Sequence, residues 1–521
     1  MQMSQAHEAT PSQGRAWEWG SATLAVAILS IIALALRFWH LGDWGLDSDE
    51  VFTLRDSIRI RPTNPRPLGY LLNHYLVLPL HPLDEFGLRV LPAFFGALAI
   101  PVMYLIGRRL IGNRAAILGA LLLAFSPLHV IYSQFGRYWA MVFLFSAIYP
   151  YAFYLGLRQR NRSLLVLGVV TGVLAVLAHP AAVLLVGGPA LWFLATQLRG
   201  ERLRSLWTQP RVRWGVLGTV LLLVLIAIRF VPILQGWIAQ HDAHPGTGQF
   251  LLAQRLPPGL KQLRYLLQYV EGWTFQLVLI SLFGLAVLWQ GRDRALARFL
   301  ITLALFPALF LPLLSLRTPI STYYLVPIAP VFFFGAGVFL DHVFSLAWKL
   351  RPWWLGGAAM TAMILAAGTP TLLSQYRNGR RFDFRGVANW VQPRLTPRDV
   401  IYSDQPAALG HYLPGSDVRP LKYNTAPLTE SLVSLRQGAD GAALWVVAPA
   451  PAHAFRTNLE QGGLADWLYQ HCQLRNIVGR GRLDFRQQYL QVYHCPPEPL
   501  SDVALLRPGH LPPQHPLEPH R

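Results

Sequence analysis

The feature that most constrains this chain is a series of about eleven long apolar runs, each of which can form a helix that crosses a bilayer. A spanning helix needs about 20 mostly apolar residues, because its backbone polar groups find no water in the hydrocarbon and must bond within the helix. The chain is therefore predicted to be a polytopic α-helical membrane protein. The predicted spans are 20–38, 87–107, 114–130, 138–157, 163–179, 180–197, 214–235, 273–290, 296–316, 321–346 and 354–373. The run between 163 and 197 is expected to break at His179-Pro180, because proline interrupts helical hydrogen bonding.

Composition and charge agree with a membrane protein and argue against a nucleic-acid-binding one. Charged residues make up 14% of the chain, against about 25% in soluble proteins. The net charge of +19 does not form a basic face on a soluble module. The basic residues gather instead in short loops between apolar runs, where they set the orientation of the helices in the membrane.

The arginine-rich loops all fall on one side if the N-terminus is placed in the cytoplasm. They lie near residues 108–114, 158–162, 199–213, 292–298 and 349–351. Positive charge favours cytoplasmic loops, so this pattern predicts a cytoplasmic N-terminus. The extracytoplasmic side then holds loops 39–86 and 236–272, the turn near Arg317 and the chain beyond about residue 374.

Two domains are expected, a membrane domain over 1–373 and an extracytoplasmic α/β domain over 374–521. Residues 399–404, 443–448 and 489–494 have the β-branched and aromatic character of strands. Residues 384–394 and 455–471 have the periodicity of amphipathic helices. The last 25 or so residues are rich in proline and histidine and are expected to be disordered.

The two cysteines, Cys472 and Cys495, both lie in this C-terminal region. Cys472 ends a predicted helix and Cys495 ends a predicted strand. A helix packed on the sheet would bring the two ends together, and disulfides persist outside the cytoplasm. A disulfide is therefore expected, with two unpaired thiols as the alternative.

Acidic residues are concentrated in the first outer loop. Residues 1–373 contain fourteen of them, and seven lie between Asp43 and Glu85. Asp49 and Glu50, close to Asp47, are the candidate catalytic residues, because adjacent carboxylates repel and one of them can act as a base near neutral pH. The alternatives are binding of a metal, orientation of a sugar hydroxyl, or an N-cap and first helical turn with no catalytic role.

Three basic stretches at the outer side are candidate binding sites. Arg137 ends a polar stretch between the third and fourth spans and can face a lipid phosphate or snorkel to the interface. Arg317 and Tyr324 lie at the outer mouth of the ninth and tenth spans. Lys261 and Arg264 fall in loop 236–272, where positive charge opposes the orientation rule. A shared phosphate ligand explains all of them, and an interfacial amphipathic helix also explains Lys261 and Arg264.

Four segments together resemble a known family. They are Arg66–Leu72 (RPLGYLL), Leu88–Gly96 (LRVLPAFFG), Gly107–Leu110 (GRRL) and Ser126–Trp139 (SPLHVIYSQFGRYW). In this order, after one span and an Asp-Glu loop, they resemble the bacterial dolichyl-phosphate-mannose-protein mannosyltransferase-like glycosyltransferases. The aminoarabinose transferase of lipid A belongs to the same superfamily. The resemblance is good over about residues 20–160 and fair around 317–330.

This resemblance implies the class C glycosyltransferase fold and a place in the inner (plasma) membrane of a bacterial cell. It implies a polyprenyl-phosphate sugar donor, a lipid, glycan or protein acceptor, and chemistry at the outer face. Asp49 takes the role of base or acceptor-orienting residue, with Glu50 beside it, and Arg66 and Arg137 fall among the donor-binding residues. Phe135 stands where many relatives have glutamate. No cofactor is implied with certainty, and a divalent cation is compatible with the site.

Two other functions are compatible with the sequence. A transporter or flippase of lipid-linked saccharide would also span the membrane, but transporters tend to have midplane polar residues and repeated halves. The predicted spans are nearly free of acids, Asp341 being the exception. A membrane scaffold that presents the C-terminal domain would not need the acids of the first loop. The sequence therefore favours a membrane glycosyltransferase.

Overall fold

The computed structural model describes residues 13–60, 64, 66–197, 275–314, 322–349, 354–379, 381–421, 443–449, 467–468, 471–480 and 488–496. The predicted span 214–235 and the loop 236–272 lie outside these residues. Contacts divide the chain into two compact units. The helical unit comprises 1–42, 56–242 and 257–376, and the sheet unit comprises 43–55, 243–256 and 377–521.

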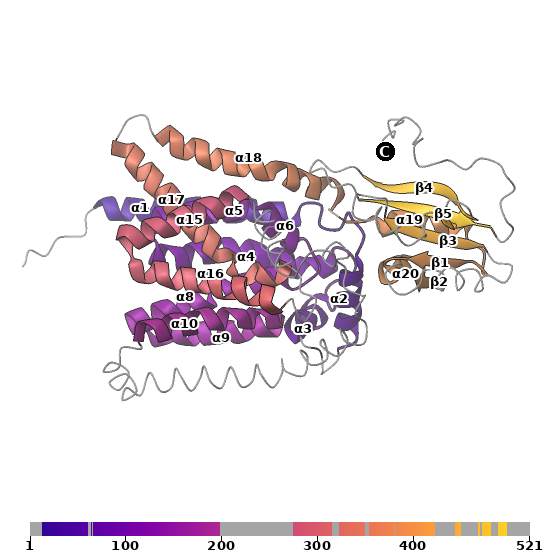
Figure 1. Ribbon diagram of the computed structural model, residues 1–521, viewed down its shortest axis with the longest axis horizontal. Helices are drawn as coiled ribbons and strands as arrows, with labels where there is room; N and C mark the ends of the chain where they lie inside the picture. Colours follow the sequence, from indigo (N-terminus) through magenta and orange to yellow (C-terminus); the bar gives the residue numbers. More distant parts are fainter. Residues whose placement is uncertain are drawn as a thin grey trace, which may run out of the picture. The chain divides into compact units, whose positions relative to one another are not determined.

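Apolar sequence makes the described part of the helical unit almost entirely helical (Figure 1). Helix α2 (Ser48–Ile58) begins in residues of the sheet unit and ends in residues of the helical unit. The other elements are α1 (Gln13–Phe38), α3 (Pro67–Leu72), the π-turn η1 (Asn73–Val77), α4 (Gly87–Leu110), α5 (Asn113–Ala124), α6 (Pro127–Ser133), α7 (Trp139–Ser146), α8 (Tyr149–Gln159), α9 (Arg162–Ala178), the 3-10 turn η2 (Pro180–Val183), α10 (Leu184–Gln197), α15 (Phe275–Val287), the π-turn η3 (Leu288–Arg292), α16 (Arg294–Leu314), the 3-10 turn η4 (Thr322–Ile328), α17 (Ala329–Lys349) and α18 (Trp354–Asn378).

Six of the described helices are long and apolar enough to cross a membrane, which confirms a multi-pass protein. They are Ser21–Phe38, Gly87–Leu110, Trp139–Gln159, Arg294–Leu311, Tyr323–Leu346 and Leu355–Arg377. Helices α5 and α6 make a seventh span if the pair, bent by 62°, counts as one. Three other predicted spans fall on shorter apolar helices, Arg162–Ala178, Pro180–Pro189 and Gln276–Gly291. The predicted break at His179-Pro180 is observed between α9 and η2.

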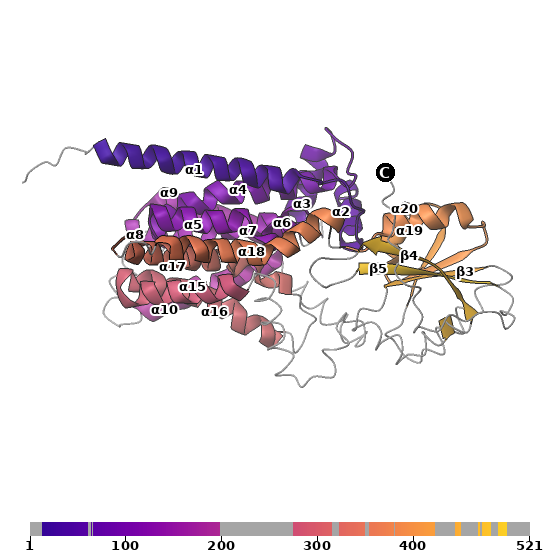
Figure 2. The same ribbon diagram turned by 90° about the horizontal axis from the view of Figure 1, so that it is seen from above.

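Helix α5 packs on α4 and α17, and α17 packs in turn on α15 (Figures 1 and 2). Glycines allow the backbones of these helices to approach closely. A Cβ atom on Gly284 of α15 would lie 1.8 Å from the carbonyl oxygen of Gly335 in α17. A Cβ atom on Gly337 would lie 2.2 Å from the carbonyl oxygen of Ala115 in α5. Small residues at such contacts are how helices associate in lipid, where no hydrophobic driving force exists between them.

The break between α5 and α6 is held by a buried arginine. Pro127 starts α6 and has no N–H to donate, so the α-helical hydrogen bond to the carbonyl of Leu123, four residues earlier, is missing. The N–H of Ser126 donates to this carbonyl instead, at 3.2 Å. The guanidinium of Arg37, fully buried on α1, donates to the carbonyls of Ala124 at 3.1 Å and Leu123 at 3.3 Å. It also donates to Nδ1 of His129 on α6 at 2.8 Å. Arg37 thereby joins α1 to both half-helices.

Gln134, the residue after α6, also connects α1 with other helices. Its Nε2 donates to the carbonyls of Leu36, Arg37 and Trp39 at the end of α1, at 3.3, 3.3 and 2.8 Å. Its Oε1 accepts from Nε2 of Gln375 on α18 at 2.9 Å. These bonds satisfy carbonyl groups that have no partner within α1 and fix the chain that leads to Arg137.

The sheet unit contains a mixed five-stranded sheet with strand order β2-β1-β3-β5-β4. Strand β1 is parallel to β2 and β3, and β5 is antiparallel to β3 and β4. Its elements are α19 (Phe384–Val391), the 3-10 turn η5 (Gln392–Arg394), β1 (Val400–Ser403), α20 (Pro406–Tyr412), β2 (Asp417–Pro420), β3 (Leu444–Pro449), β4 (Gln473–Arg480) and β5 (Gln488–Cys495). The three predicted strands correspond to β1, β3 and β5, and α19 with η5 corresponds to the predicted helix 384–394. The predicted helix 455–471 lies mostly outside the described residues.

The alternation of side chains along the strands gives this sheet two apolar faces. Ile401, Trp445 and Val447 face α19 and α20, which lie on one side of the sheet (Figure 2). Val400 and Val446 belong to a second apolar cluster on the other face. All residues of β1 and β3 are buried, which is why these strands read as continuous apolar runs in the sequence.

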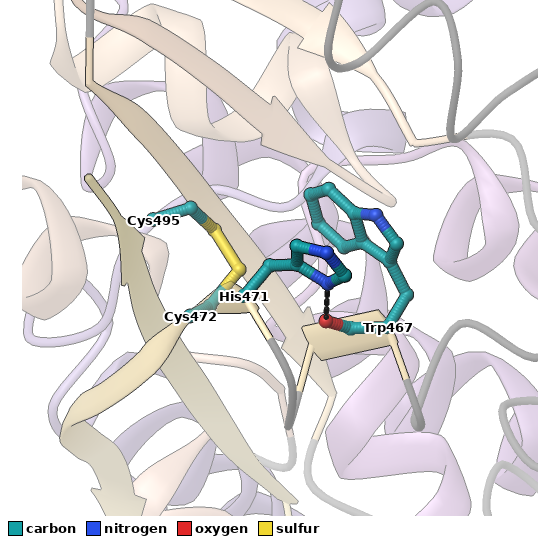
Figure 3. Close-up of a disulfide and its surroundings, with 4 residues drawn as sticks. All are labelled: Trp467, His471, Cys472 and Cys495. Carbon is teal, nitrogen blue, oxygen red and sulfur yellow. Dashed lines mark hydrogen bonds between the residues drawn. A yellow bond between two sulfur atoms is a disulfide. The ribbon is translucent and has the colours of Figure 1, made fainter. Parts of the chain in front are cut away.

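Cys472 and Cys495 form a disulfide in the second cluster, with a Cα–Cα distance of 4.0 Å (Figure 3). Cys495 ends β5 and Cys472 directly precedes β4, the neighbouring antiparallel strand. The cysteines therefore meet across two adjacent strand ends. As predicted, Cys472 also ends a helical turn, in which its N–H donates to the carbonyl of Leu468 at 2.9 Å. The sequence analysis did not predict strand β4, which follows it.

We expect replacement of both cysteines by serine to destabilise the sheet unit by about 3 kcal/mol, since the cross-link closes a loop of about two dozen residues. The measurement is thermal unfolding of the full chain in detergent, and reduced wild-type protein should unfold like the variant. Denatured, non-reduced wild-type protein should show no reactive thiol. Two reactive thiols in material from an oxidising compartment would contradict the bond.

Candidate active site

The candidate acids of the first loop belong to the sheet unit, in what we call the acidic segment, residues 43–55. Asp47 precedes helix α2, and Asp49 and Glu50 lie in its first turn. The backbone N–H of Glu50 donates to Oδ1 of Asp47 at 2.9 Å, and the N–H of Asp47 donates to Oε2 of Glu50 at 3.3 Å. This reciprocal pair is a capping box, which satisfies two N–H groups that the helix start would leave open.

Glu50 is occupied by a structural role. Its side chain is 0% exposed and forms an ion pair with Arg381, whose side chain is 8% exposed. Removing one partner of a buried ion pair leaves an uncompensated charge and is strongly destabilising. The geometry therefore assigns Glu50 to holding the acidic segment against the chain that follows α18.

Two hydrogen bonds and a close approach to Trp44 also hold the acidic segment in place. The N–H of Leu46 donates to the hydroxyl of Tyr412 on α20 at 2.6 Å, and Arg385 on α19 donates to the carbonyl of Asp43. Gly379 has a φ of +67°, and a Cβ atom there would lie 2.4 Å from Cγ of Trp44. The sequence analysis did not predict these contacts of the acidic segment, which are made by Gly379, Arg381, Arg385 and Tyr412. Arg381 and Arg385 could have indicated these contacts, because positive charge on the side predicted to be extracytoplasmic opposes the orientation rule.

Asp47 and Asp49, the other two acids at the start of α2, have different environments. The side chain of Asp49 is exposed, so its carboxylate is accessible to a substrate. Asp47 is partly buried, and burial raises its carboxyl pKa to about 6, with the negative charge of Glu50 acting in the same direction and Arg381 acting against it. Of the predicted pair, Asp49 is the exposed residue and Glu50 the buried one.

The helical unit holds a second group of candidates around one tyrosine. The guanidinium carbon of Arg66, just before α3, lies 5.1 Å from the ring centroid of Tyr138. The guanidinium carbon of Arg137 lies 4.9 Å from the same ring. Arg137 is 8% exposed and lies in the turn between α6 and α7. Cations over an aromatic face are attracted by the ring quadrupole, so Tyr138 supports both arginines.

Aromatic rings complete this group. The ring of His179, which follows α9, stacks on Tyr138 at 4.8 Å between centroids and on Tyr324 at 5.3 Å. Trp139 lies 4.7 Å from His179 and 6.1 Å from Tyr324. We call the whole set the arginine–aromatic cluster: Arg66, Arg137, Tyr138, Trp139, His179 and Tyr324.

The structure thus brings together three residues that the sequence analysis chose for substrate binding, Arg66, Arg137 and Tyr324. The other three, Lys261, Arg264 and Arg317, lie outside the described residues. The analysis did not single out His179, which it treated as the site of a helix break. A histidine inside an otherwise apolar run was the available signal, because ionisable residues at membrane depth usually serve a function.

Among the described residues, no group of three or more histidine, cysteine, aspartate or glutamate side chains is placed to hold a metal ion. No cofactor is established for this site.

Comparison with known proteins supports the predicted resemblance. Residues 67–230 match the family model "Dolichyl-phosphate-mannose-protein mannosyltransferase". No curated protein sequence matches the chain. The matched range contains four members of the cluster (Arg137, Tyr138, Trp139 and His179) and begins one residue after Arg66.

Solved structures share the fold at low sequence identity. ArnT from Cupriavidus metallidurans, in its apo state and bound to undecaprenyl phosphate, is 16% identical and has a TM-score of 0.54, with 91% of this chain and 98% of that chain covered. The archaeal oligosaccharyltransferase AglB from Archaeoglobus fulgidus, in complex with an inhibitory peptide and a dolichol-phosphate, is 14% identical and has a TM-score of 0.54, with 88% and 73% covered. Another structure of the A. fulgidus oligosaccharyltransferase, with Zn and sulfate, has a TM-score of 0.51, 15% identity and coverage of 82% and 68%. The chain therefore has the class C glycosyltransferase fold and resembles the mannosyltransferase family over residues 67–230.

Proposed function

We propose that this chain is a membrane glycosyltransferase that moves a sugar from a polyprenyl-phosphate donor to a hydroxyl group of a lipid, glycan or protein acceptor. The observation that carries the proposal is the arginine–aromatic cluster, in which two guanidinium groups lie beside one tyrosine ring. Paired guanidinium groups suit a phosphate, whose oxygens they bind bidentately. The structures with the same fold were solved with undecaprenyl phosphate and with a dolichol-phosphate, which supports a polyprenyl phosphate as the ligand.

The chemistry needs two kinds of group, and the chain supplies both. The bond between the sugar's anomeric carbon and the phosphate oxygen breaks, and the acceptor oxygen forms the new bond to that carbon. The acceptor hydroxyl loses its proton to a base, and the departing phosphate gains negative charge. Arg66 and Arg137 stabilise that charge, and the exposed carboxylate of Asp49 accepts the proton. Lys261, Arg264 and Arg317 are proposed as further donor contacts.

The orientation follows from the arginine distribution of the sequence. We propose a bacterial inner-membrane protein with about eleven spans, a cytoplasmic N-terminus and an extracytoplasmic C-terminal domain over 374–521. The first loop, which carries Asp49, and the turn that carries Arg137 are then both extracytoplasmic. Transfer takes place at the outer face of the membrane.

Incubation of the purified protein with radiolabelled polyprenyl-phosphate sugars tests this function. We expect loss of label from the donor and release of polyprenyl phosphate when an acceptor is present. A flippase of lipid-linked saccharide would move the intact donor across proteoliposomes without breaking it. Translocation without donor loss would therefore contradict the proposal and favour a transporter.

We expect Asp49→Asn to lower transfer by at least about a hundredfold, because the amide cannot accept the proton. Folding should be retained, since the side chain is exposed. Glu50→Gln is the matched control: it should lower the unfolding temperature, because it leaves Arg381 buried without its anion. Near wild-type turnover in the Asp49→Asn variant would contradict the assignment of the base.

We expect Arg66→Ala and Arg137→Ala each to weaken binding of undecaprenyl phosphate by about 1.5–3 kcal/mol, the contribution of a charge-assisted hydrogen bond. Calorimetric titration of the detergent-solubilised protein measures the effect. Arg108→Ala is the matched control, because Arg108 also lies over a tyrosine ring, that of Tyr104, but in the last turn of α4. Unchanged affinity in both cluster variants would rule out the cluster as the phosphate site.

The raised pKa of Asp47 predicts a pH dependence of stability. Its folded-state pKa of about 6 exceeds the ordinary 3.8, so folding favours the protonated carboxyl, and stability falls as pH rises from about 4 through 6. Asp47→Asn cannot ionise and still caps α2, so it should lose less stability over that window and be more stable than wild type at pH 7. Thermal unfolding of both proteins between pH 4.5 and 7.5 checks this, and parallel curves would show that Asp47 carries no such shift.

A further inference from the structure

His179 has one ring nitrogen with a structural partner. The residue is 1% exposed and lies between α9 and the proline that starts η2. The backbone N–H of Ala181 donates to its Nδ1 at 3.0 Å. A backbone N–H can only donate, so Nδ1 carries no proton, and in the neutral ring the proton sits on Nε2. His179 therefore presents a single N–H donor on the far side of its ring.

That donor has no hydrogen-bond partner within the described part of the chain, although Nε2 is fully buried. Leaving a buried donor unsatisfied costs about 1–3 kcal/mol, so a native structure that keeps one usually has a use for it. The structural bond to Ala181 uses only Nδ1 and does not require the donor on Nε2. The uncompensated N–H points to a missing acceptor.

The surroundings of the ring indicate the charge of that acceptor. Arg66 and Arg137 lie on the same tyrosine ring that stacks on His179, and the charges of both act on the imidazole. Two neighbouring guanidinium groups repel each other and disfavour a third positive charge on the histidine. A neutral N–H donor beside two cations suits an anionic oxygen, which relieves the repulsion and accepts the hydrogen bond.

We propose that the Nε2–H group of His179 is a third ligand of the donor phosphate, beside the guanidinium groups of Arg66 and Arg137. The inference rests on the proposed function, because it takes its anion from the polyprenyl-phosphate donor. The histidine donates as a neutral imidazole, and its Nδ1 is locked by the turn that Pro180 and Ala181 form. Its hydrogen bond strengthens as the departing phosphate gains charge, so His179 contributes to turnover as well as to binding.

Two substitutions distinguish the roles of the two ring nitrogens of His179. His179→Asn keeps an acceptor near Nδ1 for the Ala181 N–H and removes the distal donor. His179→Gln places an amide N–H near Nε2 and loses the acceptor at Nδ1. We expect His179→Asn to bind undecaprenyl phosphate about tenfold more weakly or worse, with an unfolding temperature near that of wild type. His179→Gln should retain most of the affinity while unfolding at a lower temperature.

Calorimetric titration measures the affinity of each variant for undecaprenyl phosphate, with undecaprenol as the phosphate-free control. Wild-type affinity in His179→Asn, or an equal loss in both variants, would overturn the role of Nε2. If wild-type protein does not distinguish undecaprenyl phosphate from undecaprenol, the proposed function itself fails, and the role of His179 fails with it. The two failures are thus distinguishable by the wild-type titration alone.

Discussion

The helical unit depends on how it satisfies the broken end of α5. A helix break inside a bilayer exposes carbonyl groups that other groups must bind, and side chains are one source of donors. Arg37 supplies such a side chain from α1, and Gln134 binds the end of α1 in return. The chain can then turn sharply between α6 and α7, and Arg137 and Tyr138 lie in that turn. The position of the proposed phosphate site therefore follows from a backbone requirement and not from its own ligands.

Buried polar residues in this protein fall into two classes by what they bind. Arg37 binds backbone carbonyls, and Glu50 and Arg381 bind each other, so these groups hold elements together. Nε2 of His179 has no such partner among the described residues, and Asp49 is exposed beside the buried Glu50. We place the chemistry at these groups, because the Nε2–H donor of His179 and the exposed carboxylate of Asp49 are the kinds of group that bind phosphate and accept a proton.

The sequence predicted the parts of this picture that depend on local patterns. Apolar runs gave the helices, proline gave the break after His179, and three apolar stretches gave the buried strands β1, β3 and β5. Arg66, Arg137 and Tyr324 were chosen separately and lie in one cluster. Contacts between distant residues could not be predicted. Glu50, a candidate base, pairs with Arg381, 331 positions away. Strand β4 was not predicted, because its polar residues and glycine lack a clear alternation. The pairing of β4 with β5, which brings Cys472 next to Cys495, was therefore not predicted either.

The central claim is that the arginine–aromatic cluster binds the phosphate of a polyprenyl-phosphate donor. A structure of the protein in a lipid nanodisc with bound undecaprenyl phosphate tests it most directly. We predict phosphate oxygens within hydrogen-bonding distance, about 3.2 Å or less, of the guanidinium groups of Arg66 and Arg137. A phosphate bound elsewhere, with both guanidinium groups still lying on Tyr138 and away from it, would contradict the account.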